Sequence, residues 1–163
     1  MHNECRENTT QSGEHLPGLT MNTGPSADPA QDAVCLDSAG RRRTRRRVRL
    51  ESGREAAVLL PPGTVMHPGD VLRSEDGLTV LVKAEPENVV LCTARDWRTF
   101  ARACWHLGNR HAPLEIGELW LRFLPDPVLE KLADSFGLSV THQTAVFMPE
   151  EGAAHSHADG SHA

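Results

Sequence analysis

The stretch DWRTFARACWHLGNRHAP, residues 96–113, decides the fold of the second half of this chain. Its apolar residues recur at steps of three and four, as they do along one face of an α-helix: Trp97, Phe100, Ala101, Cys104 and Leu107. Asp96 is a typical N-cap, and Gly108 with Asn109 is typical of a helix end. The spacing therefore predicts a helix from about Asp96 to Leu107.

The segments that follow predict a hairpin, a second helix and a last strand. PLEI (113–116) and ELWLRFL (118–124) are strand-like runs separated by Gly117. PDPVLEKLADSFG (125–137) has Asp126 as a cap, Pro127 in the first turn and Gly137 as a stop, which is typical of a helix. LSVTHQTAVFM (138–148) predicts the final strand.

The order of elements predicts the fold class. NVVLCTA (88–94) is a strand-like run before the first helix, so the order becomes strand, helix, strand, strand, helix, strand. That is the split pattern of a ferredoxin-like domain, a two-layer α+β fold. We expect this βαββαβ domain over residues 85–148 and a flexible histidine-containing tail over residues 149–163.

The first half of the chain has a different sequence pattern. From Val48 onward, short β-prone runs such as EAAVLL and TVLVKA alternate with connections rich in Gly, Pro and Asp. This pattern predicts a small all-β domain, a sandwich or barrel, over residues 41–84. Residues 1–40 are polar, without a sustained apolar period, and predict a disordered extension.

Composition excludes several classes of protein. No run of about 18 apolar residues occurs, and the N-terminus lacks the apolar middle of a secretory signal, so we expect a cytoplasmic protein without a membrane span. The four cysteines form no C-x-x-C pair, which favours reduced thiols over a disulfide framework. Cys104 is interpreted as a small apolar residue of the helix core.

Seven arginines crowd into RRRTRRRVR, residues 41–49, in a chain whose net charge is -5. A solvated edge strand with its lead-in is the favoured interpretation. An arm that binds nucleic acid or an acidic partner is the alternative. No aromatic residue is interleaved to stack on bases, which argues against a single-strand binder.

Histidines are the residues with the clearest chemistry. Three of the nine fall in the last nine residues, namely His155, His157 and His162. A His-x-His in an extended segment directs both rings to one side, where they can bind Ni(II), Cu(II) or Zn(II). A solvated polar tail, or a remnant of expression, is the alternative.

The segment WHLGNRH, residues 105–111, does not predict a catalytic site. No nucleophile with an orienting third group lies near these histidines, and neither a phosphate-binding glycine loop nor an H-E-x-x-H helix is present. At about 100° per residue, His106 falls opposite Trp97, on the face that carries Arg102. It is therefore not expected to be a core histidine.

Four motifs together resemble the urease accessory nickel metallochaperone family. They are FARACWHLGNRHAPLEI (100–116), the segment from PDPVLEKLADSFG to HSH (125–157), RLESGREAAVLLPPG (49–63) and HPGDVL (67–72). The similarity extends over about residues 42–157. It implies a cytoplasmic homodimer that is not an enzyme, with an N-terminal β domain that binds protein partners and a ferredoxin-like metal-binding domain.

The resemblance also implies the site. His111 would meet its copy across the dimer interface to hold Ni(II), helped by the tail histidines His155, His157 and His162. His106 is interpreted as hydrogen-bonded support for the helix end, with metal ligation as the less favoured alternative, and Asn109 and Arg110 as residues that position the turn. Zn(II) or Cu(II) would bind in vitro.

Two functions of different classes follow from these observations. The first is a carrier that delivers Ni(II) to the urease apoprotein complex through a GTPase accessory protein, using imidazoles as exchangeable ligands. The alternative is an arginine-rich nucleic-acid-binding or metal-responsive regulatory protein, suggested by residues 41–49. Nucleic acid is the less favoured partner.

Overall fold

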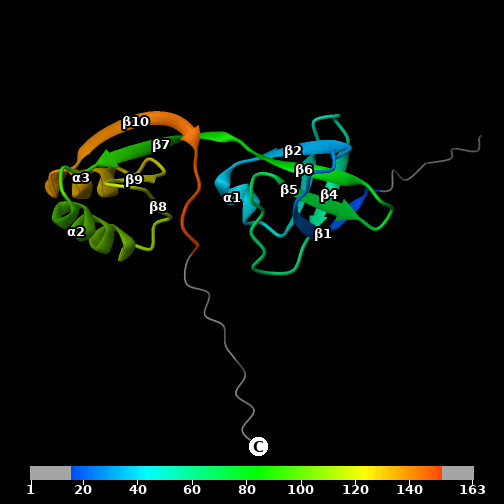
Figure 1. Ribbon diagram of the computed structural model, residues 1–163, viewed down its shortest axis with the longest axis horizontal. Coiled ribbons are helices and arrows are strands. Elements are labelled where there is room, and N and C mark those ends of the chain that lie inside the picture. The colour runs from blue at the N-terminus through cyan, green and yellow to red at the C-terminus, as the bar shows by residue number, and fades with distance from the viewer. Residues whose placement is uncertain (1–15, 152–163) are drawn as a thin grey trace, which may run out of the picture.

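The computed structural model describes residues 16–151 of the 163-residue chain. Figure 1 shows two sheets at opposite ends of the molecule, with helices α2 and α3 on the C-terminal one. The elements, in chain order, are β1 (Gly18–Pro25), β2 (Asp32–Leu36), α1 (Ser38–Arg41), β3 (Arg45–Arg49), β4 (Glu55–Leu59), β5 (Asp70–Ser74), β6 (Thr79–Ala84), β7 (Pro86–Thr93), α2 (Trp97–Gly108), β8 (Glu115–Ile116), β9 (Trp120–Phe123), α3 (Pro127–Ser135) and β10 (Ser139–Val146).

The C-terminal half has the predicted ferredoxin-like topology. Its four-stranded sheet has the order β10-β7-β9-β8, and every neighbouring pair is antiparallel. Phe100 and Leu107 of α2 and Leu129 of α3 pack with Leu121 and other sheet residues into one core. The predicted α+β fold class is therefore confirmed.

Both predicted helix starts are confirmed by their capping bonds. The Asp96 carboxylate accepts hydrogen bonds from the Thr99 N–H and hydroxyl, both at 2.9 Å, and these bonds lower the pKa of Asp96. Asp126 accepts from the N–H groups of Val128 and Leu129, and Pro127 occupies the first turn. Local sequence thus fixes where each helix begins.

The core-facing side of α2 differs from the predicted stripe. Phe100, Ala103 and Leu107 are buried, whereas Ala101 is exposed and the Trp97 side chain is 58% exposed. The prediction that Trp97 and Ala101 face the core is wrong. The helix is apolar over an arc wider than the sheet covers, and only Phe100, Ala103 and Leu107 of this arc are buried in the core.

The disorder predicted for residues 1–40 is wrong for residues 18–36. Strand β1 lies inside the six-stranded sheet, whose order is β2-β6-β5-β1-β4-β3, and β2 forms one edge beside β6. Leu19 and Val34 are 0% and 1% exposed. Leu19 is followed in β1 by a mixture of polar residues, Met21 and Gly24, without a sustained apolar alternation, so the local pattern does not predict the strand, and pairing with distant strands determines the structure. Residues 1–15 lie outside the described part.

The arginine run divides into two structural parts. Strand β3 forms the other edge of the six-stranded sheet, with Val48 in the core and Arg45, Arg47 and Arg49 exposed, as the edge-strand interpretation predicts. Arg41, however, lies at the end of α1 and is only 3% exposed. The solvated interpretation is therefore wrong for Arg41.

The six-stranded sheet also curls toward closure. Glu51, just after β3, donates its N–H to the carbonyl of Ala33 in β2 at 2.8 Å, so the two outer strands meet at one end. Of the two arrangements that the sequence allowed, a sandwich or a barrel, this closure favours the barrel. None of the helices between residues 16 and 151 has the length and apolar character needed to cross a membrane.

We expect Leu19→Ala to lower the free energy of unfolding by about 2–5 kcal/mol, because it opens a cavity in the N-terminal core. Met21→Ala, in the same strand but 52% exposed, should change it by less than about 0.5 kcal/mol. Urea unfolding followed by circular dichroism measures both variants. Equal, small effects would mean that β1 does not pack as described.

Candidate metal centre

His111 lies exposed in the turn that follows α2, and backbone bonds build that turn. The Arg110 N–H donates to the carbonyl of Leu107, and the His111 N–H to that of Gly108, each at 3.0 Å. Asn109 is the C-cap. Within residues 16–151, neither the Asn109 nor the Arg110 side chain makes a hydrogen bond, so the main chain positions the turn.

The backbone of His111 adopts a conformation that is rare for its residue type. Its φ is 55°, in the left-handed region that glycine occupies freely and other residues at a cost. Gly108, expected to end the helix, remains helical. A strained backbone at an exposed histidine is the kind of outlier from which a functional hypothesis can be drawn.

His106 connects the ends of the two helices by ring packing. Its half-buried ring stacks on Phe136, the residue after α3, with centroids 4.6 Å apart and an interplanar angle of 22°. The Trp105 ring meets His106 edge-on, also at 4.6 Å. The hydrogen bond expected for His106 is absent from the described residues, and stacking favours a supporting role in its place.

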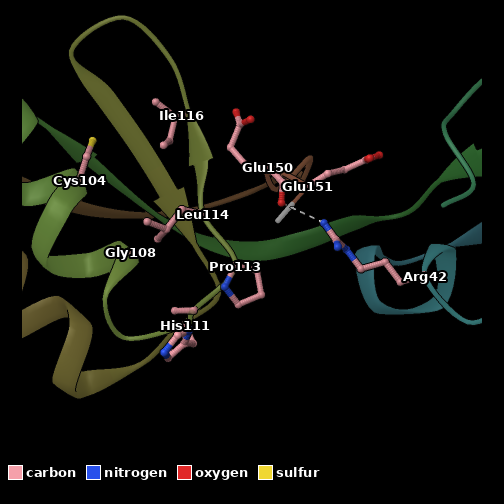
Figure 2. Close-up of a pocket in the computed structure, with 10 residues that line it drawn as sticks. Arg42, Cys104, Gly108, His111, Pro113, Leu114, Ile116, Glu150 and Glu151 are labelled. Carbon is pink, nitrogen blue, oxygen red and sulfur yellow. Dashed lines mark hydrogen bonds between the residues drawn. The ribbon is translucent and has the colours of Figure 1, made fainter. Parts of the chain in front are cut away.

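An open hollow of about 470 Å³ adjoins His111. Figure 2 shows His111 at one end of it, Cys104 beyond Leu114, and Arg42 on the side of the N-terminal half. Four separate parts of the chain line it: the end of α2 with Cys104 and Gly108, the segment His111–Leu114 with Ile116, Arg42, and Glu150 with Glu151. At this hollow, the turn that carries His111 therefore meets Arg42, the residue after α1, and the C-terminal residues Glu150 and Glu151.

The cysteines near the C-terminal core are poor metal ligands at neutral pH. Burial raises the pKa of Cys104, and burial together with the Glu130 charge raises the pKa of Cys92 to about 12. Metals bind the thiolate, so both groups would have to lose a strongly held proton first. The hollow then offers the His111 imidazole and the Glu150 and Glu151 carboxylates.

One chain does not assemble a complete ligand set from its described part. Between residues 16 and 151, no group of three His, Cys, Asp or Glu side chains is placed to hold a metal ion. The tail ligands His155, His157 and His162 lie outside the described residues, so their role stays a prediction. They follow Glu150 and Glu151 in sequence, and these two residues line the hollow.

The outer face of α2 carries a second apolar stripe. Its members are exposed or half-buried and lie at helical spacing: Trp97, Ala101, Cys104, Trp105 and Gly108. Trp105 is 64% exposed, and a side chain at Gly108 would meet no atom within 4 Å. The stripe runs into the hollow at Cys104 and Gly108. Exposed apolar patches of this kind mark protein interfaces.

Comparisons with known proteins identify related sequences for both halves. Family models described as the UreE urease accessory protein, N-terminal and C-terminal domains, match residues 13–85 and 87–163. A urease accessory protein UreE of Psychromonas ingrahamii is 42% identical over 82% of this chain and 92% of its own length. Those of Alteromonas mediterranea and a Marinomonas species are each 43% identical, over 75% and 83% of this chain and 79% and 91% of their own lengths.

The left-handed backbone at position 111 generates a stability prediction. We expect His111→Gly to have a free energy of unfolding about 1 kcal/mol higher than His111→Ala, because a Cβ in this region costs roughly 1–2 kcal/mol. At a position of ordinary φ, the order would be reversed, since glycine costs about 0.5–1 kcal/mol relative to alanine. Urea unfolding of the two metal-free variants therefore distinguishes the conformations.

Proposed function

The chain belongs to the UreE family of urease accessory proteins, and on that premise we propose that it carries Ni(II) as cargo at a histidine site shared by two copies. As a member of that family it serves urease maturation and is not an enzyme. The observation that carries the proposal is His111, held on a strained turn where the exposed apolar stripe of α2 ends.

A two-fold dimer would complete what one chain lacks. If the stripe of one copy packs on that of another, the same surface is buried on both sides, as isologous contacts require. His111 adjoins the hollow into which the stripe runs, so the two His111 side chains would approach each other near the axis. Two imidazoles then face one ion, and the tail residues His155, His157 and His162 supply the other donors.

Imidazole ligands suit a carrier that must release its metal. Ni(II) binds nitrogen donors well, and neutral imidazoles exchange more readily than a closed cage of thiolates. The raised pKa values of Cys92 and Cys104 keep these thiols protonated and out of competition. Cu(II) follows the same ligand preference with higher affinity, so Cu(II) and Zn(II) are expected to compete in vitro.

The proposed setting is the cytoplasm, where the dimer would pass Ni(II) to the urease apoprotein complex through the GTPase accessory protein. The regulatory or nucleic-acid-binding alternative is less well supported. Arg41 and Arg42 bind backbone carbonyls of the C-terminal segment instead of facing a ligand. Residues 16–84 contain no Phe, Trp or Tyr on which a base would stack.

The dimer proposal predicts a specific effect of charge on α2. We expect Trp105→Glu to shift the protein to monomer at micromolar concentration in sedimentation experiments, because an unpaired carboxylate would be buried in the interface. Val128→Glu is the matched control, since Val128 is 62% exposed on α3, away from the stripe. A dimer that survives Trp105→Glu, or dissociates equally with Val128→Glu, would place the interface elsewhere.

The metal site predicts how two sets of ligands share the binding. We expect His111→Ala to lower Ni(II) affinity by more than about 100-fold, since loss of even an outer-shell partner costs roughly 10–100-fold. Removal of residues 153–163 should leave one ion per dimer, bound more weakly than in the full chain. Calorimetric titration measures both variants.

The control for this titration is His142→Ala, because His142 is also exposed but bonds Glu130 at 3.1 Å on the helix α3 side. It should bind Ni(II) like the unaltered chain. Unchanged binding by His111→Ala would move the primary site from the turn to the tail.

A further inference from the structure

Three arginines of β3, which we call the arginine row, project from the same side of the six-stranded sheet. Arg45, Arg47 and Arg49 occupy alternate positions, and all three are exposed. Val48, which lies between two of them, belongs to the core, so the arginine row is on the outer face of the domain. Alternate residues of a strand are about 6.7 Å apart, and the row therefore presents positive charges at regular steps.

The charges of the arginine row have no counter-charge in contact with them in the described part of the chain. Between residues 16 and 151, no carboxylate oxygen lies within 4 Å of a guanidinium nitrogen of the row. Glu55 is opposite Arg49 in the register of β3 and β4 but does not reach it. At the adjacent turn, by contrast, Glu51 is paired with Lys83 at 2.8 Å. The arginine row can therefore bind carboxylates of another molecule.

An apolar surface lies beside the arginine row on the same face of the sheet. Leu59 and Ala57 of β4 are the register partners of Arg45 and Arg47, and residues directly opposite each other project to the same face. The Leu59 side chain is 48% exposed. Ala57 is in turn the register partner of Gly18 in β1, which adds no side chain. The arginine row is therefore bordered by small and apolar residues.

The fold sets the spacing of the arginine row before any ligand binds. Strand β3 pairs with β4 over its whole length, from Arg45 to Arg49. The guanidinium of Arg46, which lies between two members of the row, packs against Gly40 of α1, where a side chain would collide with it. The backbone of this surface does not have to become ordered on binding, and preorganisation of this kind favours affinity.

We propose that the arginine row is a docking site for an acidic segment of a partner protein. Carboxylates about 7 Å apart, the spacing of alternate residues in an extended chain, would face the arginine row, and a neighbouring apolar side chain would contact Leu59. Arginine suits this partner, because its planar fork of N–H donors binds a carboxylate through two hydrogen bonds. This docking site goes beyond the proposed function, since it requires neither nickel nor His111.

A protein segment fits this surface better than a nucleic acid does. Leu59 and Ala57 offer apolar contacts that a phosphate backbone does not use, and residues 16–84 contain no Phe, Trp or Tyr on which a base would stack. The net charge of the chain is -5, so a long polyanion would meet repulsion beyond the arginine row. A short acidic segment avoids it, because charges more than about 8 Å away are largely screened at physiological ionic strength.

Charged side chains on an edge strand also have a protective role, since they hinder pairing with the sheets of other molecules. Protection requires charge, but it does not account for the exposed Leu59 beside the arginine row, which adds the kind of surface that a protected edge avoids. A purely protective row would bind acidic and neutral peptides equally poorly. Peptide binding therefore separates the two roles.

Nuclear magnetic resonance titration of the full chain tests the docking site. The probe is a peptide of about nine residues with Glu at alternate positions and Leu or Ser between them, so that its carboxylates have the spacing of the arginine row. The control peptide has Gln in place of each Glu. We expect the acidic peptide to shift the amide signals of β3 and β4, and the Gln peptide to leave them unchanged.

A charge-matched pair of variants gives the contribution of the arginine row. Arg45→Gln combined with Arg47→Gln removes two exposed positive charges from the row, and Arg95→Gln combined with Arg98→Gln removes two exposed ones at the start of α2. The first pair should weaken peptide binding about tenfold, because each surface ion pair contributes up to about fivefold. The second pair should bind like the unaltered chain. Circular dichroism melting checks that both variants fold.

Leu59→Ser distinguishes a peptide site from a nucleic-acid site. It should weaken binding of the acidic peptide while all charges remain in place. A short DNA duplex that binds the arginine row more tightly than the peptide, with no effect of Leu59→Ser, would overturn the proposal in favour of nucleic acid. Absence of peptide binding, or equal loss with both arginine pairs, would also overturn it and leave the row a protective one.

Discussion

Helix α2 is apolar around more of its circumference than one sheet can cover, and this constraint organises the candidate site. The four-stranded sheet covers Phe100, Ala103 and Leu107, whereas the side chains of Trp97 and Trp105 are exposed to solvent. Burying a tryptophan side chain is worth several kcal/mol, so a helix with two apolar faces favours a second surface. In our account that surface is another copy of the same helix. The metal site then follows from symmetry, because the turn that ends α2 places His111 beside the contact.

The turn at His111 and the segment Phe147–Glu151 show how two domains converge on a single histidine. The backbone at His111 is strained, which fixes its position relative to α2, and His106 ties the same helix end to Phe136 through ring stacking. This segment adds the N-terminal domain to the arrangement, since Arg41 and Arg42 donate to its carbonyls while Leu114 and Glu115 accept its N–H groups. The N-terminal domain is therefore joined to the candidate metal site by hydrogen bonds through Phe147–Glu151.

Local signals in the sequence predicted the C-terminal domain well and the N-terminal one only in part. Asp96 and Asp126 cap their helices by side-chain hydrogen bonds to residues at most three positions away. Both helix starts can therefore be predicted from the local sequence. Strands β1 and β2 were missed because distant strands supply their pairing, and β1 has no sustained apolar alternation around Leu19. The role of Arg41 was missed for the same reason, since its partners Phe147 and Met148 lie more than 100 residues away. Periodicity alone does not show which apolar residues of α2 face the sheet, because that depends on packing.

The central claim is that one Ni(II) ion is held by His111 from two copies. The most direct measurement is the crystal structure of the nickel-loaded protein, with the ion located by anomalous scattering at the nickel absorption edge. The account predicts a nickel peak on or beside a two-fold axis. One ring nitrogen of each His111 should lie about 2.1 Å from the ion, the usual distance between a metal and an imidazole nitrogen. A nickel ion bound wholly within one chain, or by tail residues far from His111, would contradict it.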